Sequence, residues 1–487
     1  MYNNLEELMN NKIFKYFKEI SSIPRGSGNE KGISDYIFNF AKQRNLNVIQ
    51  DKYLNIIIKK EATKGYESAP TVILQGHMDM VCEKHPYIQH DFEKDPIEFE
   101  IKEDMLYAKG TTLGADDGLA IAYVLALLDD DTIEHPSLEV VLTTEEESSM
   151  FGALNIDEKL LEGKILINLD SEEEGKLLVG SAGGIDTIQR IPIAWERSKA
   201  ELVAFNINVG GLQGGHSGLE IHKRRGNANK ILGRILYDLI DDIDYNLCFI
   251  EGGKKTSAIP INSKGTILIE KDLEEKLNKK IKLWDSNLKK ELDLKEPNVY
   301  VELERLNVTL DRAFSKDTTM KVITSLNLTA DGIQTTSAHM EGLVESSSNL
   351  GIVTTKDYEV VLESGIRSSI DSLKDNMVNN IKCLSRITDS NLDFYSEYPS
   401  WNYNKDSKIL CLCKNVFEKL YNKTPEITAY HCGLECGVFI EKIPSLDCIS
   451  IGPDIFRVHT PSEHLSISST ERTWKYFLEI LKEIKYL

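Results

Sequence analysis

The chain has 487 residues, of which 41% are hydrophobic and 28% are charged, as in an ordinary globular protein. A chain of this length is too long for one compact core, so two domains are expected. Its formal net charge is -20 and its pI is about 5.1. Nucleic acid and anionic membrane surfaces would repel such a chain, which argues against either as a partner.

The N-terminal residues 1–20 place apolar residues at helical spacing, with acids and lysines between them. This segment lacks the apolar centre of a secretory signal. The sequence also has no run of about 18 apolar residues that could span a membrane. These two features predict a cytoplasmic protein.

Short apolar strands alternate with helical stretches over residues 1–186. The predicted strands include "NIIIKK", "TVILQGH", "LEVVLTT" and "KILINLD", and "DDGLAIAYVLALLDD" predicts an apolar helix. Such alternation is typical of an α/β fold, in which helices cover a central sheet. Residues 1–186 therefore predict an α/β domain.

The pattern changes over residues 187–395, where longer alternating strands and charged amphipathic helices predict a separate α+β domain. Residues 396–487 return to the first pattern, with a helix, the buried strand "LDCISIGPD" and a closing amphipathic helix. We therefore predict one domain made of residues 1–186 plus 396–487, into which the domain of residues 187–395 is inserted.

Acids and histidines follow several predicted strands of the first domain. In open α/β sheets, polar groups at the carboxyl ends of strands converge on one crevice. Histidine and carboxylate without thiolate are the ligands of Zn, Mn or Co. In isolation, "ADDG" also fits a helix cap and "EEE" a solvated acid run, but their joint occurrence at strand ends predicts a metal site. The residues concerned are His77, Asp79, Asp116, Asp117, Glu145, Glu146, Glu147, Asp170 and His459.

These motifs, in this order, resemble those of the co-catalytic dizinc metallopeptidases. His77-x-Asp79, "GADDG", "EEESSMFGA", Asp170 and His459 carry the resemblance, and "GGLQGGHSG" is similar to that family's lid-domain histidine motif. The stretches "LQGHMDMVCEK", "YHCGLECGVF" and "SIGPDIFRVHTPSEHLSI" look like the aminoacyl-histidine dipeptidases. The similarity extends over nearly the whole chain and implies a zinc-exopeptidase fold with an inserted lid and dimerisation domain.

The resemblance implies a role for each of these residues. Asp116 would bridge two divalent metal ions, most simply Zn, with Co or Mn as alternatives. His77 and Asp170 would complete one metal site, and Glu147 and His459 the other. Asp79 would orient His77 by accepting its second ring N–H. The peptide bond between Asp116 and Asp117 would be cis.

The three consecutive glutamates allow two registers against the family pattern. Alignment on residues 151–153 makes Glu146 the general base and Glu147 the metal ligand. A shift by one residue would make Glu145 the base and Glu146 the ligand, and we favour the first register. Ser149 stands where the family often has glycine.

Other residues are assigned to the substrate by the same resemblance. His216 would donate to the oxyanion from the lid, commonly that of the partner subunit in a homodimer. The C-terminal carboxylate of the substrate would be held by Arg367, by Asn262 and by backbone N–H groups around Gly433.

The implied activity is hydrolysis of Xaa-His and other dipeptides, of the β-Ala-His type, by a metal-activated water with Glu146 as the general base. Three enzymes of the same fold remain as alternatives: a tripeptidase, a general dipeptidase and an N-acyl amino acid hydrolase. A non-catalytic relative would be marked by a broken ligand set, whereas every expected position is filled here.

Overall fold

The computed structural model describes residues 2, 4–198 and 201–487. The chain divides into two compact units: the first comprises Met1–Ser181, Trp401–Ala429 and Leu434–Leu487, and the second comprises Ala182–Ser400 and Tyr430–Gly433. These boundaries lie close to the predicted ones at 186/187 and 395/396. The short segment Tyr430–Gly433 belongs to the second unit, although the sequence placed it in the first.

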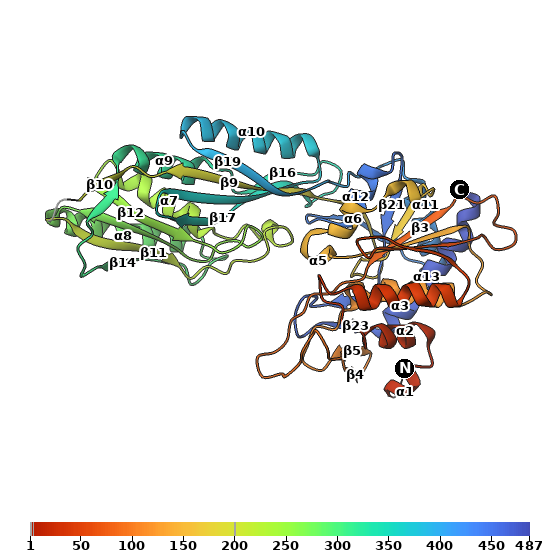
Figure 1. The fold of residues 1–487 in the computed structure, drawn as a ribbon. Helices are drawn as coiled ribbons and strands as arrows, with labels where there is room; N and C mark the ends of the chain where they lie inside the picture. Colours follow the sequence, from red (N-terminus) through yellow and green to blue (C-terminus); the bar gives the residue numbers. More distant parts are fainter. Residues whose placement is uncertain (1, 3, 199–200) are drawn as a thin grey trace. The chain divides into compact units, whose positions relative to one another are not determined.

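The first unit contains a mixed sheet with helices packed against it, as predicted (Figure 1). Its elements are α1 (Leu5–Leu8), α2 (Lys12–Ile20), α3 (Lys31–Gln43), β1 (Asn47–Gln50), β2 (Ile56–Lys60), β3 (Val72–His77), β4 (Phe99–Lys102), β5 (Met105–Ala108), α4 (Ala115–Leu128), β6 (Leu138–Thr143), α5 (Glu146–Ser149), α6 (Phe151–Asn155), η1 (Glu158–Leu160), β7 (Ile165–Asn168), β8 (Lys176–Ser181), α11 (Lys408–Tyr421), β20 (Glu426–Tyr430), α12 (Glu435–Lys442), β21 (Asp447–Ser450), β22 (Ile455–Phe456), β23 (His464–Ser466), α13 (Ile467–Glu483) and η4 (Ile484–Tyr486).

The eight strands of this sheet run in the order β1-β2-β6-β3-β7-β21-β8-β20. The central strands β6, β3, β7 and β21 are parallel, so their carboxyl ends share one edge of the sheet. All residues of β3, β6 and β7 are buried, which explains their continuous apolar runs. A second sheet, in the order β22-β23-β5-β4, was not predicted.

The helices of the first unit are explained by their apolar faces and caps. α4 contacts β3 and α2 and is buried along almost its whole length. In α2, the side chain of Asn11 caps the helix by accepting the N–H of Ile13, while Phe14 and Phe17 are buried. α11 begins at the Ser407 cap and contacts β21 and α13.

The second unit is built around an antiparallel sheet in the order β14-β11-β13-β12-β17-β18-β9-β19, to which β16 adds at β17. Its elements are β9 (Gly183–Pro192), β10 (Trp195–Arg197), β11 (Val203–Gly210), η2 (Ile221–Lys223), α7 (Ala228–Leu239), β12 (Tyr245–Gly252), β13 (Ser263–Ile269), η3 (Lys271–Leu273), α8 (Glu274–Glu291), β14 (Tyr300–Arg305), β15 (Arg312–Phe314), α9 (Lys316–Leu328), β16 (Gly332–Thr336), β17 (Val344–Thr355), β18 (Glu359–Ser368), α10 (Asp371–Ile387) and β19 (Asn391–Tyr398).

The main core of the second unit lies between this sheet and the helices α7 and α9. Leu232 and Leu236 of α7 pack there with Ile267 of β13 and Leu350 of β17. α8 buries only Leu277, Ile281 and Leu288, so most of this charged amphipathic helix faces solvent.

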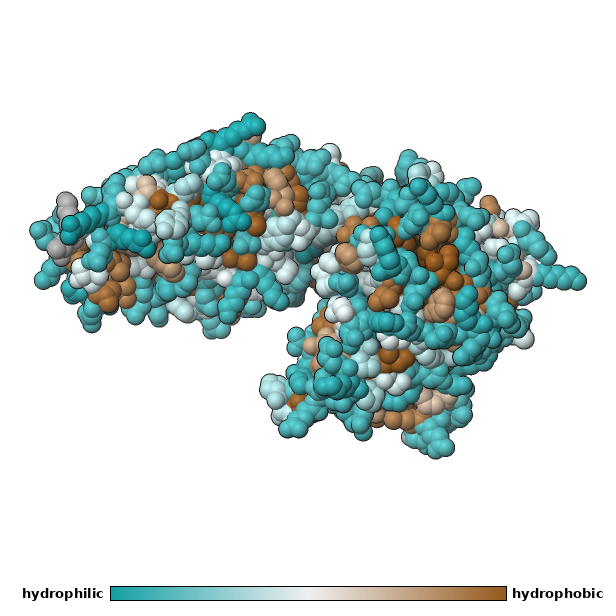
Figure 2. Space-filling model, viewed as in Figure 1, coloured by the Kyte–Doolittle hydropathy of each residue, from teal (hydrophilic) through white to brown (hydrophobic). Residues whose placement is uncertain are grey.

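The visible surface is mainly hydrophilic, with hydrophobic residues in scattered groups (Figure 2). Among the residues that the structure describes, no helix combines the length and apolarity needed to cross a membrane.

Lys230 of α7 stabilises the C-terminal end of α9. Its ammonium group donates to the carbonyl oxygens of Leu326 at 2.6 Å, Asn327 at 2.8 Å and Thr329 at 2.6 Å. Those carbonyls have no partner within the helix, so the lysine supplies the donors that the helix end lacks.

We predict that Lys230→Met lowers the free energy of unfolding by about 2–3 kcal/mol, because hydrogen bonds to a charged group contribute about 1.5–3 kcal/mol. Equilibrium urea denaturation measures the loss. The control is Lys279→Met, which removes an exposed ion pair with Glu275 on α8 and should cost less than about 0.5 kcal/mol. Equal losses in the two variants would contradict this role of Lys230.

Candidate functional site

Two groups of potential metal ligands lie in the first unit, and Asp116 belongs to both. His77, Asp116 and Asp170 form one group, and Asp116, Glu147 and His459 form the other. Within each group, one ligand atom from every residue lies within 4.8 Å of the others. The five residues predicted as metal ligands are therefore brought together.

The two oxygens of Asp116 face different histidines. Oδ1 lies 3.1 Å from Nε2 of His77, and Oδ2 lies 3.2 Å from Nε2 of His459. Nε2 of His77 is also 3.5 Å from Oδ1 of Asp170, and Nε2 of His459 is 2.9 Å from Oε2 of Glu147. A carboxylate that presents one oxygen to each group is arranged to bridge two metal ions.

The carboxyl edge of the parallel strands accounts for much of this convergence. His77 is the last residue of β3, and Asp170 follows β7, the neighbouring strand. Glu147 lies on α5, which begins shortly after β6. Asp116 lies in the first turn of α4, where its backbone is not helical, and its peptide bond to Asp117 is cis, as predicted.

Asp79 connects His77 to the glutamate turn. Its Oδ1 is 3.3 Å from Nδ1 of His77 and accepts the backbone N–H of Glu146 at 3.0 Å. Its Oδ2 accepts the N–H of Glu147 at 3.1 Å and the hydroxyl of Ser27 at 2.7 Å. Asp79 is completely buried. It therefore binds the backbone of both glutamates and lies beside His77, whose Nδ1 has no hydrogen-bond partner among the described residues.

The two registers of the glutamates differ in which residue lies among the candidate ligands. Glu147 lies beside His459, and no ligand group among the described residues includes Glu145. The carboxylate of Glu146 has no hydrogen bond or ion pair to a described residue, which leaves it available to a reactant. This arrangement favours Glu146 as the base and Glu147 as the ligand.

The electrostatics of the centre favour cations. Burial raises the pKa of Asp170 to about 7, helped by the negative charge of Asp116 and opposed by His77. Burial also raises the pKa of Glu146 well above its usual value, with repulsion from Asp170 and Glu147. Burial acts in the same direction on Asp116, but its hydrogen bonds to His459 and His77 hold its pKa below the usual range.

The donor set fits divalent metal ions. Imidazole nitrogens and carboxylate oxygens converge at a place that is buried at His77 and exposed at His459, and they are ligands that Zn, Mn and Co accept. Among the described residues, no Lys or Arg forms an ion pair with Asp116, Glu147 or Asp170. Divalent cations would supply the missing positive charge.

Two buried residues of opposite charge that the sequence analysis missed support the ligand loops. The guanidinium group of Arg25 donates to the carbonyl oxygens of Met78 and Asp79, both at 3.0 Å, and to that of Gly114. The carboxylate of Glu463 accepts the backbone N–H groups of residues 113–115 at 2.8–3.1 Å. The turn-forming segment "SSIPRGSGNE", which contains Arg25, is the sequence feature that could have drawn attention to this arginine.

The residues predicted to bind substrate belong to the second unit. Arg367 lies on β18, and its Nη1 donates to the hydroxyl of Tyr398 at 2.6 Å. Asn262 is exposed immediately before β13, and Gly433 ends the segment Tyr430–Gly433. In the described part of the chain, no hydrogen bond or ion pair joins Arg367, Asn262 and Gly433 to one another, so the structure does not by itself assemble a clamp.

His216 is held in one tautomer by its own loop. Its Nδ1 accepts the backbone N–H of Gly218 at 3.2 Å and that of Leu219 at 3.0 Å. A nitrogen that accepts in this way carries no proton, so the neutral ring has its proton on Nε2. The ring therefore presents Nε2 as a hydrogen-bond donor, which is the property the predicted role requires.

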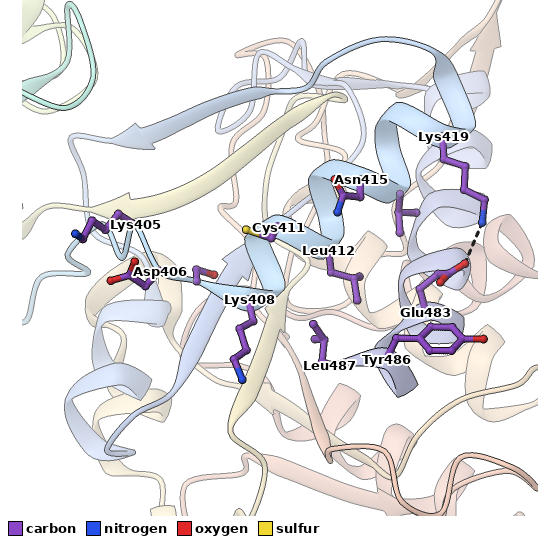
Figure 3. A pocket seen from close by; sticks show the side chains of 12 residues that line it. Lys405, Asp406, Lys408, Cys411, Leu412, Asn415, Lys419, Glu483, Tyr486 and Leu487 are labelled. Carbon is purple, nitrogen blue, oxygen red and sulfur yellow. Dashed lines mark hydrogen bonds and ion pairs between the residues drawn. The ribbon is translucent and has the colours of Figure 1, made fainter.

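A cavity of about 610 Å³ lies along α11 and the C-terminal residues (Figure 3). Leu412, Leu487 and the ion pair between Lys419 and Glu483 line part of it. None of the candidate metal ligands lines this cavity, and the residues that line it include no histidine. We therefore place the candidate site at Asp116.

Comparisons with known proteins agree with this geometry. The chain matches Peptidase family M20/M25/M40 over residues 73–483. It is 39% identical over 484 residues to the cytosol non-specific dipeptidase of Escherichia coli strain K12, covering 99% of both chains. The crystal structure of aminoacylhistidine dipeptidase from Vibrio alginolyticus matches with a TM-score of 0.88 at 35% identity, covering 97% of this chain and 96% of that one.

A tripeptidase from Staphylococcus aureus matches less closely. Its TM-score is 0.57 at 16% identity, over 98% of each chain. This likeness shows a shared fold and nothing about the substrate.

Because Asp116 belongs to both groups, we predict that its substitution lowers the number of bound metal ions more than substitution of a ligand that belongs to one group. Asp116→Ala should lose both ions, whereas Asp170→Ala or His459→Ala should lose one, because each of these belongs to a single group. Elemental mass spectrometry of desalted, zinc-loaded protein measures this. Asp91→Ala removes an exposed acid and serves as the control. Retention of both ions by Asp116→Ala would show that it does not bridge.

Proposed function

The chain belongs to Peptidase family M20/M25/M40, and on that premise we propose that it is a metal-dependent dipeptidase acting on Xaa-His and other dipeptides of the β-Ala-His type. The observation that carries the proposal is the Asp116 carboxylate shared by two ligand groups, with Glu146 directly before the candidate ligand Glu147 at the start of α5. Full-length similarity to proteins named as dipeptidases supports the substrate class.

Two divalent ions would be held at this site, Zn by preference, with Co or Mn as alternatives. His77, Asp116 and Asp170 would hold one, and Asp116, Glu147 and His459 the other. When bound, such ions supply Lewis acidity that polarises a peptide carbonyl and acidifies a water molecule. Metal identity in the cell also depends on availability, because His and carboxylate ligands suit all three.

Glu146 is the proposed general base. Its carboxylate would take a proton from the attacking water as a general base. It would then deliver that proton to the leaving amine as a general acid. The backbone hydrogen bond from Glu146 to Asp79 holds this residue in place, and the same Asp79, whose Oδ1 lies 3.3 Å from Nδ1 of His77, would orient that histidine once metal is bound. Asp79 thus aligns the base with the ligands.

The second unit would recognise the substrate. Arg367, Asn262 and backbone N–H groups around Gly433 are proposed to bind its C-terminal carboxylate, since a guanidinium fork matches a carboxylate in shape and charge. His216 would donate from Nε2 to the developing oxyanion. In the homodimer that we infer from the family resemblance, the partner subunit would supply this histidine.

The proposed setting is the cytosol, with small peptides as the partners. The name of the E. coli relative supports this location for that protein, and we extend it to this chain. The acidic net charge of -20 supports the absence of nucleic acid and anionic membrane partners.

We predict that Glu146→Ala abolishes hydrolysis, whereas Glu145→Ala retains most of it. β-Ala-His, Gly-His and Leu-Gly are the substrates, with Gly-Gly-His and N-acetyl-His as tests of the related activities. Free amino acids are measured by chromatography. Because removal of a general base typically costs about 10²–10⁴-fold in rate, the two variants should differ clearly. Full activity of Glu146→Ala would contradict its role, and cleavage of only the tripeptide or the acyl compound would contradict a dipeptidase.

We also predict that Arg367→Met raises KM for dipeptides about 10–100-fold with a smaller change in kcat, because a hydrogen-bonded charge worth about 1.5–3 kcal/mol is lost. The variant should also discriminate less against dipeptides with an amidated C-terminus. Arg190→Met is the matched control, since Arg190 lies on the neighbouring strand β9 and pairs with Glu359 and Asp393. An unchanged KM in Arg367→Met would remove Arg367 from the clamp.

A further inference from the structure

Glu435 is a buried carboxylate of the first unit that belongs to neither ligand group. It is the first residue of α12, and its side chain is completely buried. A buried acid is costly unless hydrogen bonds or opposite charges compensate it. Its surroundings therefore indicate what it is for.

One oxygen of Glu435 accepts hydrogen bonds from two neighbouring strands. Oε2 accepts a hydrogen bond from Nε2 of Gln75 on β3 at 2.5 Å and another from the hydroxyl of Thr143 on β6 at 2.7 Å. Oε1 of Gln75 in turn accepts Nδ2 of Asn168 on β7 at 2.6 Å, and Oδ1 of Asn168 accepts the backbone N–H of Asp170 at 3.3 Å. A continuous hydrogen-bonded chain thus runs from Glu435 to Asp170.

This series of hydrogen bonds crosses β6, β3 and β7 close to their carboxyl ends, just before the candidate metal ligands. Gln75 lies two residues before His77 and pairs in register with Asn168, which lies two residues before Asp170. Thr143 pairs in register with His77 itself. A single carboxylate therefore connects the ends of the strands from which His77 and Asp170 are presented.

The second oxygen of Glu435 has a different environment. Oε1 is buried and has no hydrogen-bond partner among the described residues. The charged groups that act on this carboxylate include His77, which attracts it, and Asp170 and Asp79, which repel it. A positive charge at the His77 group would therefore stabilise a carboxylate that has too few donors of its own.

We propose that Glu435 is a positioning residue for the metal group of His77, Asp116 and Asp170. It holds the ends of β3, β6 and β7 in register and places a negative charge behind the ligands. The inference rests on the metal binding of the proposed function and adds to it a residue that touches neither metal nor substrate. Carboxylates that support ligands from behind commonly change metal affinity by about 10–100-fold when they are removed.

Glu139 provides a matched control in the same sheet. It is also buried, and it accepts the backbone N–H groups of Glu162 and Gly163 and pairs with Lys59 at 2.9 Å. It lies on β6 as Thr143 does, but near the beginning of the strand, whereas Thr143 is the last residue and pairs with His77. Its loss should affect stability and leave the metal centre unchanged.

The test measures metal affinity in the full-length chain. Wild type, Glu435→Gln, Glu435→Ala, Glu139→Gln and Glu139→Ala are stripped with a chelator and titrated with Zn against a fluorescent competitor. The visible absorption spectrum of the Co-substituted protein and the melting temperature of the metal-free protein are recorded in parallel. Glu435→Gln keeps an oxygen that can accept hydrogen bonds from Gln75 and Thr143. It therefore tests the loss of charge even if Glu435→Ala does not fold.

The expected result is a loss of affinity for one of the two ions, about 10–100-fold in Glu435→Ala and smaller in Glu435→Gln, with an altered Co spectrum. Both Glu139 variants should bind metal as the wild type does, even where their melting temperature falls. Unchanged Zn affinity in Glu435→Ala would overturn the inference, as would an equal loss in Glu139→Ala. Failure of the wild type to bind metal would instead overturn the proposed function, and the inference with it.

Discussion

The structure depends on the concentration of buried negative charge around Asp116. Three carboxylates and two histidines form two ligand groups that share Asp116, and Glu146 directly precedes the candidate ligand Glu147 in the chain. Such a cluster repels itself in a medium of low dielectric constant. The fold must hold it together until cations bind, and many features of the first unit serve this purpose.

Backbone and side-chain contacts share this task. Asp79 accepts hydrogen bonds from the glutamate turn, Arg25 donates to the carbonyl oxygens of Met78 and Asp79, and Glu463 accepts N–H groups from the loop before Asp116. The parallel strands provide the frame, because their carboxyl ends lie at one edge of the sheet. The site is thus built from segments that are distant in sequence and adjacent in the sheet.

Candidate ligands could be recognised in the sequence because acids and histidines follow several apolar strands. The apolar strands β3 and β7 are unmistakable, and His77 and Asp170 lie at or just after their ends. The family resemblance then assigned the roles and the glutamate register, which strand patterns alone cannot supply. The mixed sheet and the inserted second unit were predicted in the same way, from the alternation of strands and helices and from its interruption.

The supporting residues were missed for a physical reason. Arg25 and Glu463 bind backbone groups, which leave no trace in the side-chain pattern, and their partners lie far away along the chain. Glu435 meets Gln75 across 360 positions of sequence. The small sheet of β4, β5, β22 and β23 likewise joins two distant segments of very short strands. Contacts of this kind become visible only when the sheet order is known.

We propose that the Asp116 carboxylate is shared between two metal ions. Anomalous diffraction from crystals of the zinc-loaded protein, recorded on both sides of the zinc absorption edge, tests it most directly. We expect two anomalous peaks, one on each side of the Asp116 carboxylate, the first beside His77 and Asp170 and the second beside Glu147 and His459. A single peak, or two peaks that leave Asp116 outside their coordination, would contradict it.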